Sequence, residues 1–397
     1  MSQNRFRIQT LNNISSSGLS RLPSESYEVG PEVADPHALL LRSANLHGEP
    51  IPASVLAVAR AGAGTNNIPV EEFTTRGIPV FNTPGANANA VKELVLASAL
   101  MFARNLFHAA LFARDLPGDD AQISKKVESG KKTYVGFELP GRTLGVVGLG
   151  AIGVQVANAA QALGMRVVGY DPQITVRHAW QLSAAVERAD TLEDVFRQAD
   201  FLTLHVPLND GTKNLVNTQR LSLMKPDAVL LNFARGGIVD DAAVIAALDR
   251  DQLRGYVCDF PGTTLNTHPK VIALPHLGAS TVEAEDNCAL MAADELRAYL
   301  ENGQIYNSVN LPDAKLPRNE ANTRILIVNS NVVNIVGQVT TAVAEAGLNI
   351  ADLLNTSKGE HAVTVLDVEG EVPDALRGQL AGIEGVLSVR VLHPTAA

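Results

Sequence analysis

The chain has 397 residues, 46% of them hydrophobic and 19% charged, which predicts a folded protein of two or three domains. Its 32 basic and 42 acidic side chains give a net charge of -10, so nucleic acid and an anionic membrane surface are poor candidates for partners. Two cysteines, Cys258 and Cys288, and the lack of an apolar leader predict a cytoplasmic protein without a disulfide framework.

The first part of the chain alternates short apolar runs with longer helical stretches. This alternation indicates an α/β domain. A long helix is predicted after it, from Ala88 to about Asp115. The predicted strands lie at 6–10, 38–43, 55–64 and 78–84.

A second α/β block opens at Thr143. The first strand leads into a glycine turn and a helix that ends at Leu163, before a capping Gly164. Further helices are predicted at 240–249 and at about 281–302. Strands alternating with helices in this way predict a parallel, doubly wound sheet. Its further strands are predicted at 165–172, 201–207, 228–234, 255–260 and 271–276.

The last part of the chain has a different composition and a different order of predicted elements. Residues 311–322 are polar and rich in proline, which predicts a linker. Residues 323–397 show strand and helix patterns in the order βαββαβ, which is typical of a small ferredoxin-like domain.

The strongest local motif is Gly148-Leu-Gly-Ala-Ile-Gly153. It follows a predicted strand and opens a helix, and Asp171 ends the next strand, as in dinucleotide-binding folds. The first glycine permits the tight turn, Gly150 lets a pyrophosphate approach the backbone, and Gly153 lets helix and strand pack closely. The carboxylate of Asp171 would accept hydrogen bonds from a ribose and repel a 2′-phosphate, so NAD is favoured over NADP. The alternative is a glycine-rich turn without a nucleotide.

Three polar residues follow predicted strands of this block, at the end of the strands where open α/β sheets place their sites. His276 is a candidate base, although a histidine in an apolar segment is more often a satisfied core residue. Arg235 offers a planar fork for a carboxylate, the alternative being a surface ion pair. Asp259 is the third, with a turn or capping aspartate as the alternative. We expect His205 to be structural and no metal ion to take part.

Five ordered segments together resemble the D-isomer-specific 2-hydroxyacid dehydrogenase family. The N-terminal LRSAN and a C-terminal unit similar to an ACT regulatory domain extend the resemblance over nearly the whole chain. It implies a Rossmann NAD domain inserted in a smaller flavodoxin-like α/β substrate domain, followed by an ACT-like domain. The five segments are 82–100, 148–153 with the YDP that ends in Pro172, 205–208, 232–241 and 274–281.

The resemblance also implies roles. His276 would be the catalytic base, Arg235 would orient the substrate, and Asp259 would lie near the nicotinamide carboxamide. One departure is clear: the family usually has a glutamate, a few residues after the aspartate, that holds the histidine. Here the loop reads DFPGTTLNTHPK, with Thr264 at roughly that place. The implied cofactor-binding residues are Gly148, Gly150, Ala151, Ile152, Gly153, Asp171, Phe233, Ala234, Asp259, Gly278 and Ala279.

The resemblance implies a small phosphorylated 2-hydroxy acid, 3-phosphoglycerate, as the substrate. Arg42 and Ser43 match the pair that meets the substrate phosphate, and Arg60 would join them. Backbone N–H groups of Ala61, Gly62, Ala63 and Gly64 would cradle the carboxylate. The alternative for Arg42 is an exposed strand-end charge. The alternative functions are dehydrogenation of another D-2-hydroxy acid and a non-catalytic NAD(H)-binding sensor.

The expected domains are substrate-binding (1–90 and 281–310), NAD-binding (91–280), linker (311–322) and ACT-like (323–397). The active site would then lie in the interdomain cleft and close during turnover. We expect a homodimer or homotetramer. Asn331 and Asn349 match effector positions of the ACT domain, where the family binds L-serine. The alternative is a purely structural dimerisation module.

Overall fold

A computed structural model describes residues 5–394 of the chain. The chain forms two compact units. The first unit combines the part up to Asn87 with the part from Val282 onward, and the second is Ala88–Thr281.

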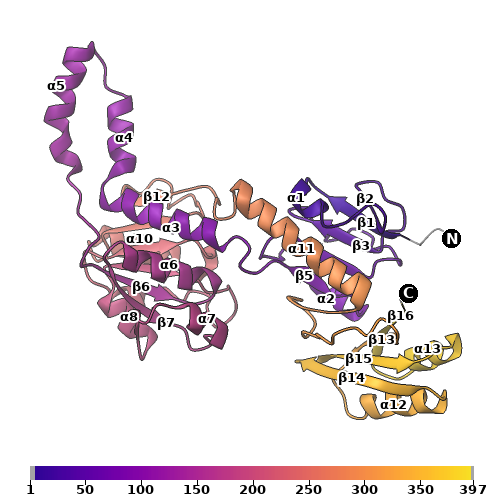
Figure 1. Ribbon diagram of the computed structural model, residues 1–397. Helices are drawn as coiled ribbons and strands as arrows, with labels where there is room; N and C mark the ends of the chain where they lie inside the picture. Colours follow the sequence, from indigo (N-terminus) through magenta and orange to yellow (C-terminus); the bar gives the residue numbers. More distant parts are fainter. Residues whose placement is uncertain (1–4, 395–397) are drawn as a thin grey trace. The chain divides into compact units, whose positions relative to one another are not determined.

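A five-stranded parallel sheet organises the N-terminal part of the first unit (Figure 1). Its order, β2-β1-β3-β4-β5, is the flavodoxin-like arrangement that was expected. The structure confirms the four predicted strands and adds β2, which the polar N-terminal sequence did not indicate. The elements are β1 (Phe6–Leu11), β2 (Tyr27–Gly30), β3 (Ala38–Leu41), β4 (Ala57–Arg60), β5 (Val80–Asn82), α1 (Ser16–Leu19), α2 (Val70–Thr75) and α11 (Val282–Asn302).

The second unit contains a seven-stranded parallel sheet in the order β12-β11-β10-β9-β6-β7-β8. The order reverses between β9 and β6, which makes this a doubly wound sheet with a switch point. All six predicted strands are confirmed. They are β6 (Thr143–Val147), β7 (Arg166–Tyr170), β9 (Phe201–Leu204), β10 (Val229–Asn232), β11 (Gly255–Cys258) and β12 (Val271–Ala273), with the short β8 (Glu187–Arg188) at the edge.

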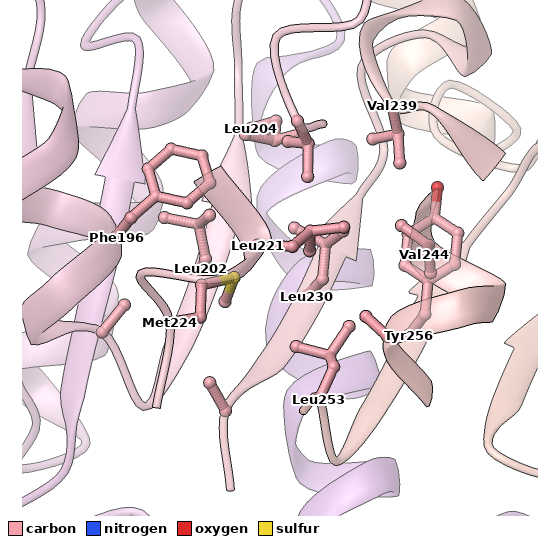
Figure 2. Packing of buried hydrophobic residues seen from close by; sticks show 14 of the residues in the cluster. Phe196, Leu202, Leu204, Leu221, Met224, Leu230, Val239, Val244, Leu253 and Tyr256 are labelled. Atoms are coloured by element: carbon pink, nitrogen blue, oxygen red, sulfur yellow. The ribbon is translucent and has the colours of Figure 1, made fainter. Parts of the chain in front are cut away.

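Helices cover both faces of this sheet, which explains why its strands are apolar on both sides. On one face, Phe196 and Tyr256 pack with strand residues such as Leu202 and Leu230 (Figure 2). On the other face, Val95 belongs to the cluster formed with α6. The helices are α6 (Ala151–Ala162), α7 (Val176–Gln181), α8 (Leu192–Gln198), α9 (Thr218–Leu221) and α10 (Asp241–Asp249), with the 3-10 turns η1 (Lys131–Tyr134) and η2 (Gly236–Ile238).

The prediction of one helix from Ala88 to about Asp115 is wrong. The chain forms α3 (Ala88–Ala103) and α4 (Leu106–Arg114), bent by 67°. Asn105 between them has a φ of 50°, a left-handed conformation that asparagine tolerates. In Figure 1, α4 and α5 (Asp120–Gly130) project together from the rest of the second unit. No single helix in the described part of the chain could cross a membrane, and α3 with α4 has the necessary length and apolar content only as a bent pair.

The C-terminal segment folds as the predicted βαββαβ unit, with an antiparallel sheet in the order β14-β15-β13-β16. Helices α12 and α13 cover one face of it. The other face, with Leu326 and Val363, shares a core with Tyr299 of α11 and Leu40 of the five-stranded sheet. The elements are β13 (Thr323–Ser330), α12 (Ile335–Glu345), β14 (Asn349–Lys358), β15 (His361–Glu369), α13 (Asp374–Ala381) and β16 (Val386–Leu392).

The segment expected to be a linker, 311–322, is an ordered part of the first unit. Leu311 and Ala314 are buried, and Ala314 forms a bridge with Ile305. The guanidinium of Arg324 donates hydrogen bonds to the carbonyl oxygens of Leu316 and Pro317. The C-terminal sheet is therefore fixed to the end of α11 rather than tethered by a free segment.

Candidate active site

The glycine turn after β6 has the geometry that a dinucleotide requires. Gly148 has a φ of 92°, and a Cβ there would lie 2.5 Å from the carbonyl oxygen of His205. A Cβ on Gly153 would lie 1.9 Å from the carbonyl oxygen of Gly148, so the helix can approach the turn only without a side chain. Around Gly150, by contrast, there is no atom within 4 Å of a Cβ position. The first N–H groups of α6 face this open space, where a pyrophosphate fits.

Asp171 ends β7 next to this turn. Its Oδ2 accepts a hydrogen bond from the N–H of Leu149 at 2.9 Å, and its Oδ1 accepts one from Gln173 at 2.8 Å. These bonds orient the carboxylate beside the glycine turn. Each oxygen keeps a second lone pair that can accept a ribose hydroxyl.

The three polar residues that the sequence analysis singled out after strands lie at the same edge of the sheet. Arg235 follows β10, Asp259 follows β11 and His276 follows β12, and these strands are neighbours that run parallel. Because the glycine turn follows another parallel strand of the same sheet, all of these groups lie along its carboxyl edge.

Asp259 is completely buried, and in the described part of the chain neither of its carboxylate oxygens has a hydrogen-bonding partner. Burial raises the pKa of Asp259, while the charges of His276 and Arg235 oppose that rise. A buried carboxyl with unused oxygens is available to a further hydrogen-bond donor, such as a carboxamide.

His276 is exposed, and its ring packs at 5.0 Å on the ring of Phe260. The loop from Phe260 to Lys270 contains no carboxylate. Thr264, which stands at roughly the place of the usual glutamate, is exposed, and its carbonyl oxygen accepts a hydrogen bond from Thr267. Within the described second unit, no carboxylate is hydrogen-bonded to the His276 ring, which contacts Phe260 and interacts electrostatically with Asp259.

The remaining predicted cofactor residues flank these groups. Phe233 is buried and Ala234 half-buried after β10, with the N–H of Ala234 bonded to Asn232. Gly278 is buried and Ala279 half-buried after His276. His205 is structural in its contacts: its Nε2 lies 3.0 Å from Oγ1 of Thr203, and burial lowers its pKa to about 3.

The predicted phosphate ligands lie together in the first unit, at the ends of β3 and β4. The Nε of Arg60 donates to the carbonyl oxygen of Arg42 at 3.1 Å. Two residues that the sequence did not single out also contact this group. The Oδ1 of Asn12 accepts the N–H groups of Arg42, Ser43 and Ala44, and Glu285 lies 2.7 Å from the Nη2 of Arg42. The one sequence signal for Asn12 is its place at the end of a strand.

The expected carboxylate cradle at 61–64 is smaller than predicted. The N–H of Ala61 donates to the carbonyl oxygen of Leu41, and that of Gly62 donates to Arg60. Of the four N–H groups at 61–64, those of Ala63 and Gly64 make no hydrogen bond to the described residues. The cradle therefore consists of these two groups at most.

One chain does not bring the two predicted effector residues together. The Nδ2 of Asn331 donates a hydrogen bond to the carbonyl oxygen of Gly359, which directly follows Lys358, the last residue of β14. Asn349 begins β14 and donates to Glu369. The length of this strand, about 30 Å at about 3.3 Å per residue, separates them.

Comparison with known proteins agrees with this geometry. Residues 106–278 match the family model for the NAD binding domain of D-isomer specific 2-hydroxyacid dehydrogenases. A curated relative from Haemophilus influenzae, named D-3-phosphoglycerate dehydrogenase, is 33% identical over 92% of this chain and 89% of its own length. The chain belongs to the D-isomer specific 2-hydroxyacid dehydrogenases.

Two further comparisons agree with this result, one in sequence and one in fold. A D-3-phosphoglycerate dehydrogenase from Methanocaldococcus jannaschii is 38% identical over 64% of this chain, and the match spans only 48% of that longer protein. The crystal structure of NAD+-bound 3-phosphoglycerate dehydrogenase from Entamoeba histolytica shares the fold, with a TM-score of 0.60 at 24% identity over 77% of this chain and 99% of that one. This chain is an NAD-dependent 2-hydroxyacid dehydrogenase.

Proposed function

We propose that the chain oxidises D-3-phosphoglycerate to 3-phosphohydroxypyruvate, the first step of L-serine biosynthesis. The observation that carries this proposal is the presence of two arginines, Arg42 and Arg60, at the ends of the neighbouring strands β3 and β4, where the Arg60 guanidinium donates to the carbonyl oxygen of Arg42. Guanidinium forks suit a phosphate. Relatives that share most of the chain are named for this reaction.

The reaction removes a proton from the substrate hydroxyl and a hydride from the same carbon. When bound, NAD supplies the hydride acceptor. We assign the hydroxyl proton to His276, because an exposed imidazole at a strand end can take it as a general base. Arg235 orients the substrate carboxylate and polarises the oxygen that becomes the carbonyl.

Asp259 has a supporting role in this proposal. Its buried carboxyl, whose oxygens have no partner among the described residues, would accept a hydrogen bond from the nicotinamide carboxamide and help to hold the cofactor.

A substrate series tests the proposal. NADH formation is measured at alkaline pH with 3-phosphoglycerate, glycerate and D-lactate, and the reverse reaction is measured with the matching keto acids. We expect 3-phosphoglycerate to have the highest kcat/KM. Equal values for glycerate would favour a dehydrogenase of another D-2-hydroxy acid. NAD binding without turnover of any substrate would favour a sensor.

We further propose that the C-terminal sheet is an ACT-like effector and oligomerisation module in a homodimer or homotetramer. Asn331 and Asn349 lie at opposite ends of the edge strand β14, so an antiparallel pairing of two copies would bring one of each together. Titration with L-serine, combined with light scattering, tests this. Absence of both heat and inhibition at millimolar serine would leave only the oligomerisation role.

A further inference from the structure

The guanidinium of Arg42, which the proposed phosphate site needs, forms an ion pair with a carboxylate of the protein. The Nη2 of Arg42 lies 2.7 Å from Oε1 of Glu285, in the first turn of α11. The Arg42 side chain is 36% exposed and that of Glu285 43%, so the pair is open to an incoming ion.

The backbone donors at this strand end, and one nitrogen of Arg60, are already engaged. The N–H groups of Arg42, Ser43 and Ala44 all point to Oδ1 of Asn12. The Nε of Arg60 is bonded to the carbonyl oxygen of Arg42. The guanidinium of Arg42 is therefore one of the two cationic groups that this strand end offers to an anion, and Glu285 is paired with it.

A phosphate monoester carries a charge of about -1.5 to -2 at neutral pH and prefers the same planar fork as a carboxylate. The two anions compete for Arg42 and repel each other at that distance. We propose that Glu285 is a specificity-determining residue that competes with the substrate phosphate for Arg42. This inference rests on the proposed function. A phosphorylated substrate must displace Glu285 from Arg42, whereas a substrate without a phosphate need not.

The test compares Glu285→Gln with Glu283→Gln. Glu283 lies in the same first turn of α11, is exposed, and forms no ion pair in the described part of the chain, so it controls for the loss of one charge at this helix end. The KM and kcat for 3-phosphoglycerate and glycerate are measured. The Kd of each acid for the NAD-loaded enzyme is measured by calorimetry.

Glu285→Gln should lower both the KM and the Kd of 3-phosphoglycerate by about three- to fivefold, the range expected for an exposed ion pair. Its kcat and all values for glycerate should stay within about twofold, and Glu283→Gln should change nothing. A raised KM would show that Glu285 holds Arg42 in place instead, and an equal effect on glycerate or from Glu283→Gln would show general electrostatics. Each of these results overturns the inference. If the wild-type enzyme binds 3-phosphoglycerate without oxidising it, the proposed function fails, whereas the Kd comparison still tests Glu285.

Discussion

Arg324 and Asp367 form a bidentate ion pair in the centre of the C-terminal sheet, with both side chains completely buried. The Nε–Oδ1 and Nη2–Oδ2 distances are both 2.7 Å. The remaining N–H groups of Arg324 donate to the carbonyl oxygens of Asn302, Leu316 and Pro317. One side chain thus joins β13 and β15 to the end of α11 and the segment that follows it.

Removing one partner of this pair should destabilise the first unit strongly. Asp367→Ala leaves a buried guanidinium charge without its counter-ion, which costs about 3–5 kcal/mol. Urea unfolding at neutral pH measures the loss. As a control, Glu187→Ala removes the exposed partner of Arg166 and should leave the unfolding midpoint unchanged. A loss below about 1 kcal/mol for Asp367→Ala would contradict the assignment.

The glycine turn gives a matched pair of variants. Gly153→Ala places a methyl group 1.9 Å from the carbonyl oxygen of Gly148, so α6 must move and stability should fall by about 2–3 kcal/mol. Gly150→Ala meets no atom within 4 Å and has an ordinary φ of -78°, so stability should be retained. Because its methyl group lies where the pyrophosphate is expected, the Kd for NAD should rise about tenfold or more. Wild-type NAD affinity in Gly150→Ala would mean that the cofactor lies elsewhere.

His276→Ala should abolish hydride transfer while NAD still binds. The reason is that the variant loses the base but keeps the glycine turn and Asp171. Hydride transfer is followed by the stopped-flow absorbance of NADH. Loss of a general base should lower its rate by about 100- to 10,000-fold. Fluorescence titration with NADH is the control. Retention of full activity would remove His276 from the mechanism.

The sequence predicted the parallel strands well, because apolar runs buried on both faces leave a clear pattern. It missed the break at Asn105, since asparagine is acceptable in a helix and its left-handed conformation depends on the packing of α3 and on the Val135 carbonyl oxygen. It also missed Glu285 and Asn12 as neighbours of Arg42. These contacts join residues far apart in the chain, and no local pattern reports them.

The buried carboxyl of Glu295 is another feature that the helical pattern could not show. This side chain on α11 is completely buried, and its Oε1 accepts a hydrogen bond from Asn307 at 2.7 Å. Its Oε2 has no partner in the described residues. Burial raises the pKa of Glu295 from 4.5 to about 8. The folded protein therefore keeps a proton that the unfolded chain releases at a lower pH.

This difference predicts that stability falls as the pH rises between about 4.5 and 8 and levels off above that range. Glu295→Gln is neutral at every pH and keeps an oxygen for Asn307, so it should lack this dependence. Relative to wild type it should gain about 2–4 kcal/mol between pH 5 and pH 8, measured by urea unfolding at pH intervals of about one unit. Glu283→Gln, on the exposed side of the same helix, should follow the wild-type curve. A stability difference between Glu295→Gln and wild type that stays constant across this pH range would show that Glu295 is ionised in the folded protein.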